Sequence, residues 1–127
     1  MRKITVFLFL LGSLTVFSSC SLLSLTKGLD EMMALEVGGI SLSAVENGSY
    51  RGSFTFERWS NMLEVTVQGH AITAISIIKD VRFAKAEVSN AIFEKVLDQQ
   101  SLGVDAVSGS TVTSKAYLKS IELALQP

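Results

Sequence analysis

The chain of 127 residues has few of the residue types from which cross-links and metal sites are made. It contains one cysteine, one proline and one histidine. A single cysteine excludes a disulfide within the monomer, and a lone histidine without neighbouring cysteines argues against a metal site. We therefore expect no bound metal, an exposed turn position for His70, and one modest domain.

Patterns typical of nucleic-acid binding and of catalysis are also missing. Lysines and arginines are isolated rather than clustered with aromatic residues, which argues against nucleic-acid binding. The sequence has no Ser-His-Asp set, no phosphate loop of the nucleotide-hydrolase type and no recognisable pair of catalytic carboxylates. Glu87, Glu94 and Asp98 are better explained as a solvated helix face. We expect a carrier rather than an enzyme.

The N-terminus has the order of residues that is typical of an export signal. Arg2 and Lys3 precede an apolar run over residues 4–17, which is too short to span a bilayer comfortably, and small residues follow. Residues 17–20, Phe-Ser-Ser-Cys, resemble a bacterial lipobox with Phe where Leu or Val is commoner. The resemblance implies a signal peptide over residues 1–19 and lipidation of Cys20.

Lipidation would place the mature protein outside the cytoplasm on a membrane, facing the periplasm in a Gram-negative cell. Several acyl chains on Cys20 would give lasting attachment, whereas one chain gives only marginal binding. An ordinary secretory peptide with a free cysteine, or an uncleaved N-terminal anchor, remains an alternative. Without Arg2 and Lys3, nine Lys and Arg remain against 12 Asp and Glu, so the mature chain has a net charge of about −3.

Residues 20–47 are predicted to be a tether between the lipidated N-terminus and a domain over residues 48–127. The apolar residues of the tether favour a short amphipathic helix, and Gly38 with Gly39 indicates a break after it. These apolar residues are Leu22, Leu23, Leu25, Leu29, Met32, Met33 and Leu35. We expect a spacer with no role beyond its reach.

From residue 48 the apolar residues alternate with polar ones, which is typical of strands with one buried face. We predict a first strand, a second strand, a tight turn at residues 68–70, and a third strand over residues 71–78. The first is marked by Tyr50, Phe54 and Phe56, and the second by Leu63, Val65 and Val67.

Two amphipathic helices are predicted to cover the buried face of this sheet, over residues 84–99 and 114–125. Val88, Ile92 and Val96 form the apolar stripe of the first helix. The fold class is therefore α+β, with a small antiparallel β-sheet packed against helices.

A run of hydroxyl residues lies just before the last predicted helix, with Thr113 or Ser114 as the expected N-cap. The free N–H groups and the dipole at a helix start favour an anion, and Gly109 lets the backbone bend closely around a phosphate. This arrangement suits phosphate without any basic side chain. Ser, Gly and Thr before a helix are also common capping residues, so capping alone remains an alternative.

Residues 105–111 resemble the flavinylation motif of the FMN-binding domain family, which reads Asp, two residues, Ser or Thr, Gly, Ala and Thr. Asp105, Ser108, Gly109 and Thr111 match the fixed positions, and Ser110 stands where Ala is usual. The similarity covers roughly residues 48–125. One departure is the pair of residues 79–80, Lys-Asp, where the small-domain family is expected to have a histidine.

The resemblance implies that FMN is held covalently, through a phosphoester bond to Thr111. A separate flavin transferase, using FAD and a divalent metal ion, would attach it after export, and redox partner proteins would exchange electrons with it. Asp105 would help to orient the acceptor hydroxyl or be recognised by the transferase; the alternative is that it only caps the loop. Ser110 could compete with Thr111 as the acceptor. The implied FMN-binding residues are Thr111, Asp105, Ser108, Gly109, Ser110, Thr113 and Ser114.

Three aromatic residues, Trp59, Tyr50 and Phe83, are candidates to stack on the flavin ring, although core or surface packing is the simpler role for each. The domain would be a lipid-anchored electron carrier or a flavin-bearing module of a reductase complex. The alternative is a flavin-free lipoprotein with a binding or structural role.

Overall fold

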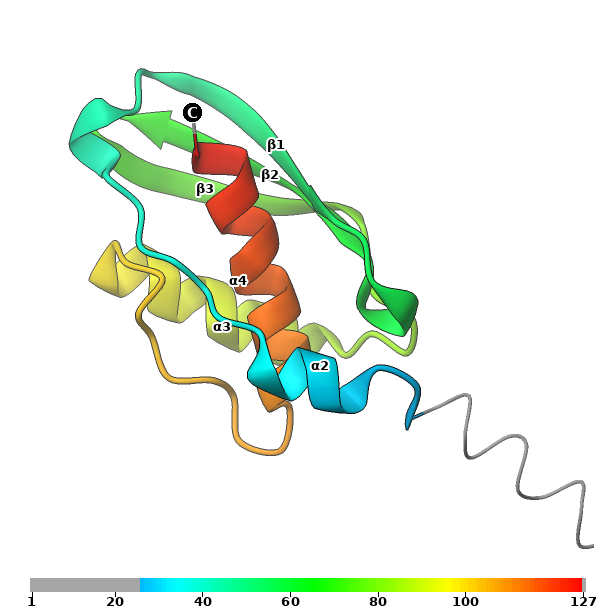
Figure 1. Ribbon diagram of the computed structural model, residues 1–127. Coiled ribbons are helices and arrows are strands. Elements are labelled where there is room, and N and C mark those ends of the chain that lie inside the picture. Colours follow the sequence, from blue (N-terminus) through cyan, green and yellow to red (C-terminus); the bar gives the residue numbers. More distant parts are fainter. Residues whose placement is uncertain (1–25, 127) are drawn as a thin grey trace, which may run out of the picture.

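The computed structural model describes residues 26–126, so the predicted signal peptide and Cys20 lie outside the described residues. Among the residues described, no helix is both long and apolar enough to cross a membrane. The elements in chain order are α2 (Leu29–Ala34), the 3₁₀ turn η1 (Leu42–Ala44), β1 (Gly48–Phe54), the 3₁₀ turn η2 (Glu57–Trp59), β2 (Asn61–Gln68), β3 (Ala71–Lys79), α3 (Ala86–Gln99) and α4 (Thr111–Leu125) (Figure 1).

The three strands form the predicted antiparallel meander in the order β1-β2-β3. Gln68 pairs with Ala71, which leaves Gly69 and His70 as a two-residue hairpin loop. Both loop residues have positive φ, 59° and 60°, as a hairpin with right-handed strand twist requires. His70 is exposed, as expected, and its Nδ1 lies 3.2 Å from the carbonyl oxygens of Leu42 and Val45.

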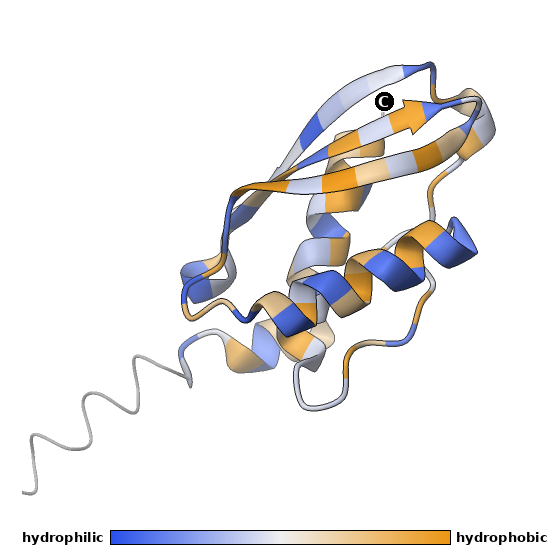
Figure 2. Ribbon diagram, turned by 180° about the vertical axis from the view of Figure 1, so that it is seen from behind, coloured by the Kyte–Doolittle hydropathy of each residue, from blue (hydrophilic) through white to orange (hydrophobic). Residues whose placement is uncertain are grey.

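The buried face of the sheet is set by alternation along β2, where Leu63, Val65 and Val67 are fully buried. Figure 2 shows hydrophobic and hydrophilic residues alternating along the strands and along α3. Helix α4 lies across β1 and β2, and α3 lies against β3 and α4. The predicted α+β fold, a small antiparallel sheet packed against helices, is confirmed.

Close contact between α4 and β1 depends on Gly52. A Cβ atom on this residue would lie 1.8 Å from the carbonyl oxygen of Ser120 and 2.6 Å from the amide nitrogen of Ala124. Only a residue without a side chain lets the helix backbone come this near to the strand. This contact fixes the height of α4 above the sheet and therefore the position of its first turn.

Several predicted boundaries were wrong by two or three residues. The first strand ends at Phe54 rather than including Phe56, because the chain turns at Glu57, where φ is +45°. Helix α3 begins at Ala86, because Phe83 has φ +59° and Lys85 is extended. Helix α4 begins at Thr111, so neither Thr113 nor Ser114 is its N-cap.

The segment before the sheet is not a free spacer over its described part. Met32 of α2 is 1 % exposed and packs with Trp59, Val112 and Ala116 in a small cluster separate from the main core. Lys115 of α4 also donates from Nζ to the carbonyl oxygen of Met33 at 2.6 Å. Residues of the predicted tether therefore pack on the first turns of α4.

Candidate functional site

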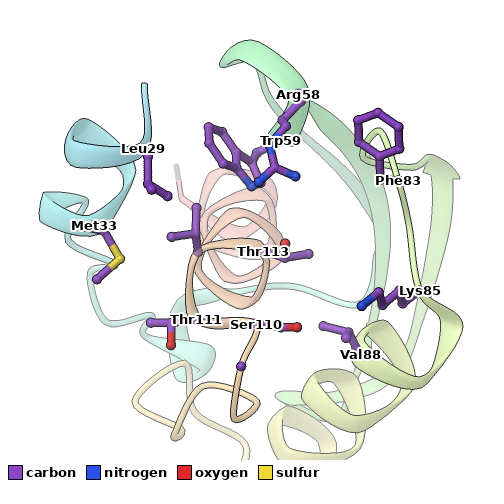
Figure 3. Close-up of a pocket in the computed structure, with 12 residues that line it drawn as sticks. Leu29, Met33, Arg58, Trp59, Phe83, Lys85, Val88, Ser110, Thr111 and Thr113 are labelled. Atoms are coloured by element: carbon purple, nitrogen blue, oxygen red, sulfur yellow. The ribbon is translucent and has the colours of Figure 1, made fainter. Parts of the chain in front are cut away.

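A pocket of about 490 Å³ opens at the start of α4 (Figure 3). Its walls come from α2, η2, the segment between β3 and α3, the start of α3, the loop that leads into α4, and the first turn of α4. The lining residues are Leu29, Met33, Arg58, Trp59, Phe83, Lys85, Val88, Gly109, Ser110, Thr111, Val112 and Thr113. The volume lies within the range of about 300–1,000 Å³ that is usual for small-molecule sites.

The loop before α4 is held in shape by Ser114. This residue is fully buried, and its hydroxyl donates to the carbonyl oxygen of Ser110 at 2.8 Å and accepts the N–H of Val107 at 3.1 Å. The N–H of Ser110 donates to the carbonyl oxygen of Val107 at 2.9 Å, which closes a tight turn. Gly109 adopts the left-handed conformation that this turn needs, with φ +78°.

The first turn of α4 offers backbone donors to the pocket. Thr111, Val112 and Thr113 come before the first intrahelical bond, in which the N–H of Ser114 donates to the carbonyl oxygen of Ser110 at 2.9 Å. Ser110 is the N-cap residue but makes no side-chain capping bond. Capping therefore does not account for this hydroxyl, and the helix start is suited to bind an anion.

Two cations, Arg58 and Lys85, line the pocket together with these donors, and no acidic residue lines it. The Arg58 guanidinium lies 4.4 Å from the centre of the Trp59 ring, a cation–π contact. The expectation that phosphate would be bound without basic side chains is thus incomplete. Sequence reasoning missed both residues, because neither belongs to a basic cluster and only the tertiary fold brings them to the motif.

Two of the three aromatic candidates line the pocket, Trp59 and Phe83. Trp59 is 1 % exposed and belongs to the cluster around Met32, whereas Phe83 is 63 % exposed. Tyr50 lies elsewhere and donates its hydroxyl to the carbonyl oxygen of Glu46 at 2.7 Å. Of the three, Phe83 is the ring most open to a ligand.

A model of the FMN-binding domain matches residues 60–126, which is more than half of the chain and includes the whole motif. The chain belongs to the FMN-binding domain family. Flavin binding, with FMN as cofactor, follows from this membership. No curated protein and no solved structure matches the chain.

The pocket of this FMN-binding domain brings together Gly109, Ser110, Thr111 and Thr113 of the predicted site. Asp105, Ser108 and Ser114 do not line it. Ser114 is the buried residue that shapes the loop, and Ser108 is exposed beside Gly109. Asp105 is exposed as well, and its carbonyl oxygen accepts from Lys95 Nζ at 3.0 Å.

The residues present fit FMN in two respects. Helix-start N–H groups and two cations match an anionic phosphate, and an exposed aromatic ring matches the planar isoalloxazine. Thr111 is the first residue of α4 and its side chain is exposed, so its hydroxyl can be reached from solvent. Within residues 26–126 no group of acidic, histidine or cysteine side chains is arranged to hold a metal ion.

Asp80 occupies the place where the family was expected to have a histidine, and it has a structural role in this chain. Its Oδ1 accepts the Tyr117 hydroxyl at 2.5 Å and the N–H of Val81 at 2.8 Å. Burial, together with the hydrogen bond to Asp80 and its negative charge, raises the pKa of Tyr117 far above its ordinary value. The neutral phenol therefore ties the start of the segment between β3 and α3 to α4.

Proposed function

We propose that Thr111 carries FMN through a phosphoester bond and that the protein passes electrons through this flavin as a carrier or as a subunit of a redox complex. The observation that best supports attachment at this residue is the position of Thr111. Its exposed side chain lies at the first residue of α4, on the rim of a pocket with backbone donors, cations and an exposed aromatic ring. The family match includes this residue.

A separate flavin transferase would attach FMN to Thr111 with FAD as the donor. Thr111 Oγ1 bonds to the phosphorus of the flavin half, the bond between the two phosphates breaks, AMP leaves, and the hydroxyl proton is lost. The linkage leaves the isoalloxazine ring intact as the redox centre. The chain itself needs no catalytic group for this step, because the transferase supplies the chemistry.

The remaining residues of the pocket would hold and orient the cofactor. The phosphodiester keeps one negative charge, which the N–H groups at the start of α4 and the cations Arg58 and Lys85 can neutralise. Ser110 and Thr113 line the pocket with half-buried side chains and can donate to the phosphate or to the ribityl hydroxyls. The protein would thus fix the position of the ring and the charge around it.

We propose further that the mature protein is anchored by lipid on Cys20 and works outside the cytoplasm. The N-terminal sequence supports this, with its charged start, its short apolar run and its lipobox-like residues 17–20. Its partners would then be redox proteins at the same membrane. Labelled fatty acid should be incorporated into the wild type and not into Cys20→Ser; labelling of both would contradict the anchor.

The covalent claim is tested by the intact mass of protein from cells that contain the transferase. We expect an increment of one FMN minus water in the wild type and in the control variants Ser110→Ala and Thr113→Val. Thr111→Val should lack the increment while keeping its fold. Unmodified wild type from cells that contain the transferase would refute the proposal and favour a flavin-free binding lipoprotein. If the mass increment is lost only in a control variant, the residue replaced in that variant is the acceptor.

A further inference from the structure

We propose that the isoalloxazine ring rests against Phe83, with Lys85 as the cation beside it. The inference depends on the proposed attachment to Thr111 and adds where the ring lies in the pocket. The pocket has two unlike sides (Figure 3): Leu29 and Met33 of α2 lie on one and Phe83 and Lys85 on the other. The start of α4 lies between them, as does Arg58, whose guanidinium contacts Trp59.

Phe83 has features that packing alone does not explain. It has the largest exposed fraction, 63 %, of the large hydrophobic residues described, and it stands in the wall of the pocket. Its φ of +59° is a left-handed conformation that costs a residue with a large side chain about 1–2 kcal/mol. The fold therefore holds an apolar ring in the solvent and in an unfavourable backbone conformation.

The segment that carries Phe83 is fixed at two points. Asp80 accepts the Tyr117 hydroxyl from α4, and the N–H of Arg82 donates to the carbonyl oxygen of Arg58 at 2.9 Å. The Arg82 guanidinium also lies 5.5 Å from the centre of the Phe83 ring. A ring that is held in place before a ligand arrives loses little conformational freedom on binding, which suits a stacking surface.

Charge distinguishes this side of the pocket from the other. Reduction of a flavin adds negative charge to the ring, and a nearby cation stabilises that charge. Lys85 lies on the Phe83 side, whereas the lining residues from α2, Leu29 and Met33, are uncharged. Lys85 is exposed and forms no ion pair with any of the residues described. Its charge is thus available to the ring.

The path from Thr111 to Phe83 is also suited to the cofactor. Figure 3 places Thr111 toward Met33 and Phe83 on the far side, with Ser110 and Thr113 between them. The ribityl chain separates the phosphate from the ring, so the ring does not have to lie next to its point of attachment. The hydroxyls of Ser110 and Thr113 can bind the ribityl hydroxyls along this path.

Visible circular dichroism of the flavinylated protein tests the position of the ring, because a ring held by the protein gives a signal that a freely rotating one loses. Phe83→Ala should lose most of this signal, and Phe83→Tyr, which keeps a planar face, should retain it. Ile78→Ala, which is exposed outside the pocket, should leave the signal unchanged, and Met33→Ala on the opposite side of the pocket should reduce it less than Phe83→Ala does. Intact mass confirms the flavin in each variant.

The midpoint potential tests Lys85 on the same samples. Lys85→Met should shift it to a lower value, because the reduced flavin loses a stabilising charge, and Lys85→Arg should restore it. A covalent flavin whose signal depends on Met33 rather than Phe83, or whose potential is the same in Lys85→Met, would overturn the inference but leave the attachment standing. A missing mass increment in the wild type would overturn both.

Discussion

Replacing Met32 by alanine tests whether α2 is an integral part of the fold rather than a passive segment. Met32 is 1 % exposed, and its neighbours in the cluster are Trp59, Val112 and Ala116. The substitution removes the buried end of the side chain and leaves a cavity, which costs about 2–5 kcal/mol for a methionine in a core. The cluster is small and separate from the main core, so we expect a cost at the lower end of this range, about 2–3 kcal/mol.

The effect should be easy to measure in urea. With a dependence of about 1–3 kcal/mol per molar urea, a loss of about 2–3 kcal/mol lowers the unfolding midpoint by about 0.7–3 M. It should also lower the melting temperature by about 10–20 °C, since each kcal/mol is worth about 4–8 °C in a domain of this size. Trp59 is the only tryptophan of the chain and belongs to the affected cluster, so its fluorescence reports the transition directly.

Met33→Ala is a matched control for this measurement. The residue is of the same type and adjacent in sequence, but its side chain is 53 % exposed, so we expect a change below about 0.5 kcal/mol. Both variants are best compared in protein made in the cytoplasm without residues 1–19, where neither lipid nor flavin is attached. Equal and small effects at both positions would show that α2 does not dock on α4 in solution.

Two further predictions concern the contacts that position α4. Tyr117→Phe removes a half-buried hydrogen bond to the Asp80 carboxylate and should cost about 1.5–3 kcal/mol. Because folding raises the pKa of Tyr117 above its unfolded value near 10, the contribution of this group to stability should be constant below about pH 10 and fall above it, by up to about 1.4 kcal/mol per pH unit. Urea midpoints on both sides of that pH should show the added alkaline slope in the wild type only, and its persistence in Tyr117→Phe would assign it to other groups. Gly52→Ala forces a methyl group against the Ser120 carbonyl and should cost about 2–3 kcal/mol or more, whereas Gly39→Ala, with open space around the new Cβ, should change stability little in the same assay.

Much of the fold could be predicted because it depends on local pattern. Leu63, Val65 and Val67 alternate with polar residues, and a strand with one buried face is the direct consequence. The hairpin loop at Gly69 was predicted from its residue type. The start of α4 was predicted too late, because Val112 and its threonine neighbours are β-branched and have low helix propensity. Burial of Val112 against Met32 and Trp59 offsets that preference, and no local pattern reveals such a contact.

The candidate site also contains residues that the sequence predicts and residues that only the tertiary fold brings to it. Residues 105–114 form a continuous motif, so the acceptor and its turn could be proposed from the sequence. Arg58 and Lys85 could not, because isolated cations carry no pattern and their place beside the motif depends on where η2 and the segment after β3 fold. Met33 was assigned to a spacer, and only the docking of α2 brings it into the pocket wall.

The boundary of the family match has a consequence for comparisons among its members. The match begins at residue 60, but Leu29, Met33, Arg58 and Trp59 of the pocket precede it. A fragment trimmed to the shared region would keep the motif and Phe83 but lose one complete wall and one cation. Two proteins with the same motif can therefore differ in the solvent exposure and in the positive charge of the pocket around the flavin. Classification by the shared region alone would therefore group together FMN-binding domains whose flavin pockets differ.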